Sequence, residues 1–118
     1  MNTTQLSLFA ARPMTEPDYT DCATIAERFE AFHQRNPQVY AALRDMALEL
    51  HRRGHRQYGI KALFEVLRFS AAMQTHGDPF KLNNNYTALY ARLLMDNEPE
   101  LVGFFELRRR TADPAHVV

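Results

Sequence analysis

The amino-acid sequence predicts an all-α protein, a small bundle of about five helices that follows a flexible N-terminal tail. Three observations lead to this fold class. From about residue 20 onward, apolar residues recur at intervals of three and four, as they do on one face of a helix. Proline, glycine and asparagine stand at the breaks between these stretches. No stretch alternates apolar and polar residues in the way of a half-buried strand.

The first helix is expected to end just before Asn36-Pro37. Thr24 and Glu27 have the spacing of a capping box at its start. Because a residue that precedes proline disfavours helical geometry, the helix should stop at Asn36. Its apolar face has helical spacing and consists of Ile25, Phe29 and Phe32.

The second helix is expected to begin at the same Asn-Pro pair. Asn36 fits the N-cap and Pro37 the first helical position, where its missing N–H is not needed. Gly54 is the expected C-terminal cap, because glycine tolerates the left-handed conformation found there. The apolar face of this helix consists of Val39, Leu43, Met46, Ala47 and Leu50.

Three further helices are predicted in the second half of the chain. The third ends near Thr75, and its buried face is expected to be Ile60, Leu63, Phe64, Leu67 and Ala71. The fourth starts after an asparagine cap and carries Tyr86, Leu89, Tyr90, Leu93 and Leu94. The fifth starts at Pro99 and carries Leu101, Phe104, Phe105 and Leu107. Three methionines are interpreted as core filler, namely Met46, Met73 and Met95.

The domain organisation follows from these elements. Residues 1–20 contain two prolines and no helical apolar period, which predicts a flexible tail. Residues 21–111 form the helical domain, and residues 112–118 form a frayed C-terminal tail. A chain of 118 residues, 46% of them hydrophobic, is long enough for one such domain and not for two. Its charged fraction of 24% is typical of a globular protein.

Charge and cysteine content narrow the function classes. The formal net charge is zero, which excludes a protein that is strongly basic as a whole. Residues 1–50 have four arginines and seven acids, a net of −3, and residues 51–118 have ten Lys/Arg and seven acids, a net of +3. The single cysteine, Cys22, excludes an intramolecular disulfide. No apolar run approaches the ~20 residues of a membrane span, and no signal peptide is recognised. We therefore expect a cytoplasmic location and no contact with a membrane.

The most specific sequence feature is the segment Gln5-Leu6-Ser7-Leu8-Phe9 in the predicted tail. It resembles the motif with which bacterial polymerases, mismatch-repair proteins and replication regulators bind the β sliding clamp. That motif has Gln, then Leu, then Ser or Asp, then Leu-Phe, and all five positions match. The resemblance implies that the β sliding clamp is a partner. It also implies that the Gln5 amide hydrogen-bonds in a small subsite and that Leu8 and Phe9 fill a deeper apolar pocket.

The physical chemistry of a tail peptide agrees with such a role. Burial of Leu8 and Phe9 yields roughly 1.5–3 kcal/mol each. Ordering the backbone opposes this gain, so micromolar affinity is expected. The linker from Ala10 to Tyr19 can extend ~33 Å at most, which would let the domain sit beside the clamp and near the DNA that passes through it. The alternative is that Leu6, Leu8 and Phe9 pack against the helical core of this protein.

Two polar clusters are candidates for contact with DNA. The stretch from His51 to Lys61 contains no acid, and its cations are Arg52, Arg53, Arg56 and Lys61. Cations and amides at helix starts bind phosphates. The second cluster consists of Lys81, Asn83, Asn84 and Asn85, and asparagine can pair with adenine edges in the major groove. The third and fourth helices would then form a helix-turn-helix variant with the fourth helix as the reader.

The same residues also have a purely structural interpretation. Cations at a helix C-terminus interact favourably with the negative end of the helix dipole, and consecutive asparagines are ordinary caps and turn formers. The connection over roughly residues 76–83 is longer than the turn of a typical helix-turn-helix unit. Base-specific reading is therefore the less favoured of the two nucleic-acid hypotheses, and contact with phosphates is the more favoured.

A second resemblance covers the domain but assigns no site. The domain is loosely similar to small uncharacterised helical proteins encoded by phages and prophages, in the segments FHQRNPQVY, YGIKALFEVLRF, KLNNNY and FFELR. No firm activity is associated with that group.

Neither catalysis, a cofactor nor a metal site is expected. His51 and His55 have the spacing of two ligands on a helix, but Gly54 should end the helix between them, and no third ligand is evident. Glu65 and Arg68 are interpreted as a local ion pair on the third helix. Cys22 lacks the neighbouring histidine or basic helix start of a nucleophile.

Four functional hypotheses remain open at this stage. The favoured one is a clamp-binding accessory protein of DNA replication, repair or phage DNA metabolism, whose domain adds a second contact with DNA. Another is a phage-type inhibitor that competes with polymerase for the clamp. A third is a helix-turn-helix-like DNA-binding regulator whose tail motif is incidental. The last is a helical interaction module that binds no nucleic acid, and the oligomeric state is open in all four.

Overall fold

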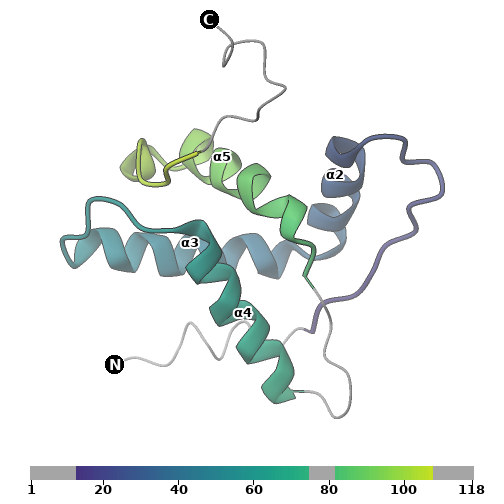
Figure 1. The fold of residues 1–118 in the computed structure, drawn as a ribbon, viewed down its shortest axis with the longest axis horizontal. Coiled ribbons are helices and arrows are strands. Elements are labelled where there is room, and N and C mark those ends of the chain that lie inside the picture. Colours follow the sequence, from purple (N-terminus) through teal and green to yellow (C-terminus); the bar gives the residue numbers. More distant parts are fainter. Residues whose placement is uncertain (1–12, 75–81, 108–118) are drawn as a thin grey trace, which may run out of the picture.

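The fold is all-helical in the computed structural model, which describes residues 13–74 and 82–107 (Figure 1). The α-helices of these residues are α2 (Ile25–Arg35), α3 (Pro37–Arg52), α4 (Ile60–Gln74) and α5 (Thr87–Asn97). Two short 3-10 turns flank α5, namely η1 (Asn84–Tyr86) and η2 (Pro99–Leu101). The described ranges contain no β-strand. The all-α class predicted from the sequence is therefore confirmed.

The long helix α3 is the centre of the fold. It contacts α2, α4, α5 and η2, and α4 also contacts α5 (Figure 1). Its predicted apolar stripe is the reason, because Val39, Leu43 and Ala47 are completely buried. All five predicted core residues of α4 are buried as well, namely Ile60, Leu63, Phe64, Leu67 and Ala71. Spacing alone predicted the buried stripe of α4 correctly, whereas Met46 and Leu50 of the predicted α3 stripe are only partly buried.

Aromatic rings join α2, α4 and α5 through Tyr90. Its ring lies 4.7 Å from that of Phe29 and 6.0 Å from that of Phe64, both in edge-on geometry. Edge-on pairs add stability beyond the area that they bury. Burial raises the pKa of the Tyr90 phenol above its ordinary value, because the charged form would lose its hydration. Within the described residues, the buried Tyr90 hydroxyl has no hydrogen-bond partner.

The helix boundaries follow the local signals of the sequence. Thr24 and Glu27 form the predicted capping box: the Thr24 hydroxyl accepts from the Glu27 N–H at 3.1 Å, and the Glu27 carboxylate accepts from the Thr24 N–H at 3.2 Å. Pro37 opens α3, and Gly54 follows it with φ of 100°, in the left-handed region that favours glycine. Asn83 caps η1 by accepting from the Asn85 N–H at 2.8 Å.

The fifth helix predicted after Pro99 is wrong. Only the single turn η2 forms there, and Gly103, with φ of 76°, interrupts helical geometry directly afterwards. The apolar residues of this segment are nevertheless buried, with Leu101, Phe104 and Phe105 at most 3% exposed. Phe104 and Phe105 are adjacent in sequence, and their rings lie edge-on at 5.1 Å. A helix would point adjacent residues in different directions, whereas this irregular turn buries both.

The described part of the predicted flexible tail, from Pro13 onward, packs against the helices. Met14 is only 8% exposed and belongs to the core cluster. Asn36, expected as a side-chain cap of α3, makes no such capping bond. Its fully buried amide instead accepts from the N–H of Thr15 and donates to the carbonyl of Thr15, each at 2.8 Å. Residues from Pro13 onward thus contact the helices, although the tail was predicted to extend to residue 20.

One of the three methionines predicted to fill the core is exposed. Met46 and Met95 pack against the core as expected, but Met73 is 71% exposed.

None of the helices in residues 13–74 and 82–107 combines the length and apolar character that a membrane span requires.

Candidate functional site

The residues of the predicted clamp motif, Gln5 to Phe9, lie outside the described residues. The structure does describe where the tail joins the domain. The Gln38 side-chain amide donates to the carbonyl of Pro13 at 3.2 Å, and Asn36 bonds both backbone groups of Thr15. The Arg35 guanidinium also donates to the Thr15 hydroxyl at 3.1 Å. We call these contacts the tail anchor. It fixes the chain four residues after the motif ends.

The basic turn between α3 and α4 carries three of the predicted nucleic-acid residues. Arg52, Arg53 and Arg56 are all exposed. Arg53 donates to the Glu49 carboxylate at 2.7 Å, so its charge is partly neutralised. Among the described residues, Arg52 and Arg56 take part in none of the ion pairs. These two side chains are therefore the better candidates for contact with an anion.

Backbone geometry limits what this turn can bind. The N–H groups of Arg53, Gly54 and His55 bond to carbonyls in the last turn of α3, between 3.0 and 3.2 Å. The end of the helix here is its C-terminus, which carries the negative end of the dipole. A phosphate beside Arg52 and Arg53 would thus be held by arginine side chains and not by the amides at the end of α3. Such contacts attract nucleic acid without reading its sequence.

Lys61 and two of the predicted asparagines line one pocket. The pocket has a volume of about 390 Å³ and lies between the first turns of α4 and the start of α5. Its polar lining includes Lys61, Arg68, Asn84 and Asn85. The structure thus brings Lys61 together with the asparagine cluster, although the sequence grouped Lys61 with the arginines of the turn. Lys81 lies outside the described residues.

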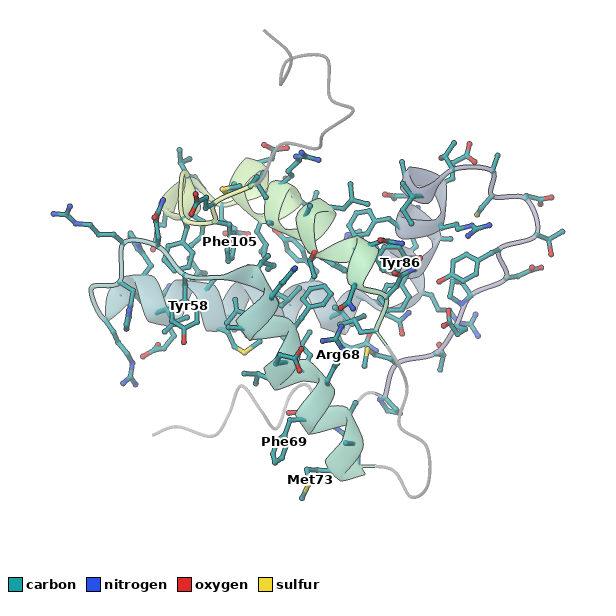
Figure 2. All side chains as sticks on the ribbon, viewed as in Figure 1. Tyr58, Arg68, Phe69, Met73, Tyr86 and Phe105 are labelled. Atoms are coloured by element: carbon teal, nitrogen blue, oxygen red, sulfur yellow. The ribbon has the colours of Figure 1, made fainter. Side chains whose placement is uncertain are left out.

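Arg68 organises this pocket and was missed as a site residue. Its guanidinium donates to the Glu65 carboxylate at 2.6 Å, as the predicted local pair requires. It also donates to the carbonyl of Leu82 at 3.3 Å and to the Asn84 side-chain oxygen. Figure 2 shows Arg68 on the side of α4 that faces Tyr86. Since Leu82 and Asn84 are far from Arg68 in sequence, no local pattern could have indicated these contacts.

Two of the three asparagine side chains make hydrogen bonds within the protein. The Asn83 side chain caps η1, and the Asn84 side chain accepts from Arg68. The carbonyl of Asn84 also accepts from the Thr87 hydroxyl at 3.0 Å. Of the three, Asn85 has an exposed side chain for which no such structural bond is seen in the described part. The structural interpretation of this cluster is therefore supported for Asn83 and Asn84.

Helix α5 is poorly equipped to read bases. A recognition helix presents polar side chains from its first turns to the major groove. In α5 the side chains of Thr87, Tyr90, Ala91 and Leu94 are buried, and Arg92 is the exposed polar residue of its first two turns. Twelve positions separate the end of α4 at Gln74 from the start of α5 at Thr87. This connection is much longer than a helix-turn-helix turn.

Comparison with known proteins adds no assignment. No protein-family model, no curated protein and no solved structure matches the chain. The described residues also contain no group of three or more His, Cys, Asp or Glu side chains that could hold a metal ion.

Proposed function

We propose that this protein binds the bacterial β sliding clamp through Gln5 to Phe9 and acts as an accessory protein in DNA replication, repair or phage DNA metabolism. The observation that carries the proposal is the match of all five motif positions in the segment QLSLF. In this proposal Gln5 makes the polar contact, and Leu8 and Phe9 supply the apolar burial. Leu6 and Ser7 lie between them in the motif.

The tail anchor supports a close placement of the domain on the clamp. Phe9 precedes Pro13 by four residues, and four residues span ~14 Å at most. A tail that was free up to Tyr19 would allow ~33 Å, as estimated from the sequence. The shorter tether restricts the domain to the immediate surroundings of the clamp pocket. The effective concentration of the domain at that surface is correspondingly higher.

The domain would contribute a second contact through the basic turn. Arg52 and Arg56 are exposed and take part in none of the described ion pairs, so they are available to phosphates. We favour backbone contact over base reading, because the first turns of α5 bury their side chains. Two weak contacts joined by a short tether bind more tightly than either alone. A regulator of the helix-turn-helix type is accordingly the less favoured alternative.

The competitor hypothesis shares the clamp contact and differs in outcome. An inhibitor would occupy the pocket that polymerase needs, and the domain would act by its bulk. Primer extension with and without clamp separates the two hypotheses. A competitor suppresses clamp-dependent synthesis and leaves clamp-independent synthesis unchanged. An accessory protein at the same concentration leaves both rates unchanged.

A titration of purified clamp tests the shared proposal. The wild-type protein should bind saturably with micromolar affinity. The double variant Leu8→Ala/Phe9→Ala should lose most of this affinity, because the substitutions remove apolar burial that contributes roughly 1.5–3 kcal/mol per side chain. Val102→Ala is a matched control, since Val102 is another exposed apolar residue, 75% exposed on the folded domain. Equal affinities of the wild type and the double variant would exclude both clamp hypotheses.

A further inference from the structure

Helix α4 has a second apolar face that the fold leaves in water. Its buried face packs on α3 and α5. On the other side, residues spaced four, three and four apart form a continuous row, which we call the α4 stripe: Ala62, Val66, Phe69 and Met73. Such spacing keeps the row on one face of the helix. A helix that is apolar on both sides normally has protein on both sides.

The C-terminal half of the stripe is a projection. Phe69 is 67% exposed and Met73 71% exposed. Figure 2 shows both side chains leaving the same side of α4 near its end, opposite to Arg68. With Val66 and Tyr58, each 38% exposed, they leave roughly 400 Å² of side-chain surface in water. A patch of that size on a monomer is commonly an interaction site.

The N-terminal half of the stripe is a hollow. A pocket of about 250 Å³ lies between α3 and α4. Ala62 and Val66 line it together with Tyr58, and its remaining lining residues are Met46, Glu49, Leu50 and Leu63. The lining is apolar except for Glu49 and the Tyr58 hydroxyl. The small side chain of Ala62 leaves room for an apolar group from outside.

We propose that the α4 stripe binds the α4 stripe of a second copy of this chain, in antiparallel orientation. A two-fold axis near the middle of α4, between Leu67 and Arg68, places Met73 of each copy over Ala62 of the other. The same axis places Phe69 against Val66. Met73 in the projection and Ala62 in the hollow lie eleven residues apart on one helix, or ~16 Å. In the antiparallel pair, the projection of each copy can therefore enter the hollow of the other at the same time. A two-fold interface needs this self-complementarity.

The charges beside the stripe are compatible with this pairing. Glu65 flanks the stripe on α4 and holds Arg68 at 2.6 Å, while Glu49 at the pocket holds Arg53 at 2.7 Å. Each acid is thus already paired with a cation of its own copy. Two copies can approach without an uncompensated negative charge from either one.

The size of the face predicts a weak dimer. Two copies would bury roughly 800 Å² of this surface in total, below the ~1,200 Å² at which stable interfaces begin. Association should therefore be reversible and depend on concentration in the micromolar range. The proposal does not depend on the clamp motif, and clamp binding would be tested separately.

Sedimentation of the full-length protein over a range of concentrations tests the proposal. The wild type should shift from monomer to dimer as concentration rises. Phe69→Glu and Met73→Glu should each weaken association about tenfold or more, because they put a charge into the apolar contact. Val102→Glu is the matched control, because Val102 is 75% exposed but directly follows η2 and is not on α4. The dimer of this variant should persist. Circular dichroism verifies that each variant is folded.

Cysteine cross-linking tests the register. In a Cys22→Ser background, a mixture of Ala62→Cys and Met73→Cys chains should give the mixed 62–73 disulfide in excess over both symmetric products. Symmetric cross-links in excess would contradict the antiparallel pairing, and a wild type that is monomeric at all concentrations would overturn the proposal. If Leu8→Ser/Phe9→Ser then increases the reactivity of Met73→Cys in that monomer, the occupant of the stripe is the protein's own tail and not a second copy.

Discussion

Asn36 holds the tail on the helices, and its replacement by alanine should separate them. The side chain is completely buried. Its oxygen accepts from the Thr15 N–H at 2.8 Å, and its nitrogen donates to the carbonyls of Thr15 at 2.8 Å and Phe32 at 3.1 Å. Asn36→Ala removes these three bonds, and a fourth that the Asn36 oxygen accepts from the Gln38 side-chain amide at 3.4 Å, without placing a larger group in the core. The perturbation therefore removes the Asn36 part of the tail anchor together with the bonds to Phe32 and Gln38.

The size of the effect follows from these bonds. Each hydrogen bond contributes about 0.5–1.5 kcal/mol net. Water can reach the backbone groups of Thr15 once the tail moves away, so the full cost of burying unpaired groups is not incurred. We expect a decrease of about 2–3 kcal/mol in the free energy of unfolding. That is a large fraction of the ~5–15 kcal/mol available to a typical domain.

Urea denaturation measures this decrease, and hydrogen exchange shows where it arises. The Thr15 amide should exchange faster in Asn36→Ala, because its acceptor is gone, while amides in the middle of α3 keep their order of protection. Asn85→Ala is the matched control, since Asn85 is exposed and its replacement should change stability by less than about 0.5 kcal/mol. A decrease below about 0.5 kcal/mol for Asn36→Ala, with unchanged exchange at Thr15, would refute the tail anchor.

Three further results are expected. Tyr90→Phe should maintain or raise stability, because the buried hydroxyl has no partner in the described part of the chain. Burial raises the pKa of Tyr90 in the folded protein above its value of about 10 in the unfolded chain. The stabilisation that comes from the neutral phenol is therefore fully present below about pH 10 and is lost as the pH rises further. Thermal melts of the variant should show a smaller alkaline decline, and an unchanged decline would contradict this. Arg68→Ala should cost about 1–2 kcal/mol in urea denaturation, because Glu65, Leu82 and Asn84 lose a shared donor, whereas a neutral effect would mean that the pocket does not depend on it. Replacement by serine of all three arginines of the basic turn should reduce the slope of log DNA affinity against log salt by roughly 0.9 for each phosphate that the turn no longer neutralises, and equal slopes would exclude the turn. These arginines are Arg52, Arg53 and Arg56.

Local signals in the sequence predicted most of the helical boundaries. Thr24, Pro37 and Gly54 mark ends that depend on bonds within a few residues, and all three act as predicted. Periodicity also predicted the buried face of α4. These features are local, so a short stretch of sequence contains the information that fixes them.

Long-range contacts explain the errors. Asn36 has the position of a cap, but its side chain bonds a residue 21 positions earlier. Phe104 and Phe105 were assigned to a helix because they are apolar, whereas their burial comes from an irregular turn around Gly103. The exposure of Met73 depends on how far α4 extends beyond its neighbours, which spacing cannot indicate. Arg68 acquires its role only once η1 is folded beside it.

A dimer through the α4 stripe would change what the protein presents to the clamp. Two copies would carry two tails, each tethered within ~14 Å of its anchor. Bivalent display raises avidity where both motifs reach a pocket. Substitution of Phe69 would then lower the apparent affinity for the clamp without touching the motif itself.

Competition for the clamp's peptide pocket shows whether Gln5 to Phe9 binds the clamp. A fluorescent peptide that contains QLSLF is first bound to purified clamp, and the full-length protein is then added while anisotropy is recorded. We expect complete displacement at micromolar protein, and little displacement by Leu8→Ala/Phe9→Ala at the same concentrations. If the wild-type protein leaves the peptide bound, or if the double variant displaces it equally well, Gln5 to Phe9 is not a clamp-binding motif in this protein.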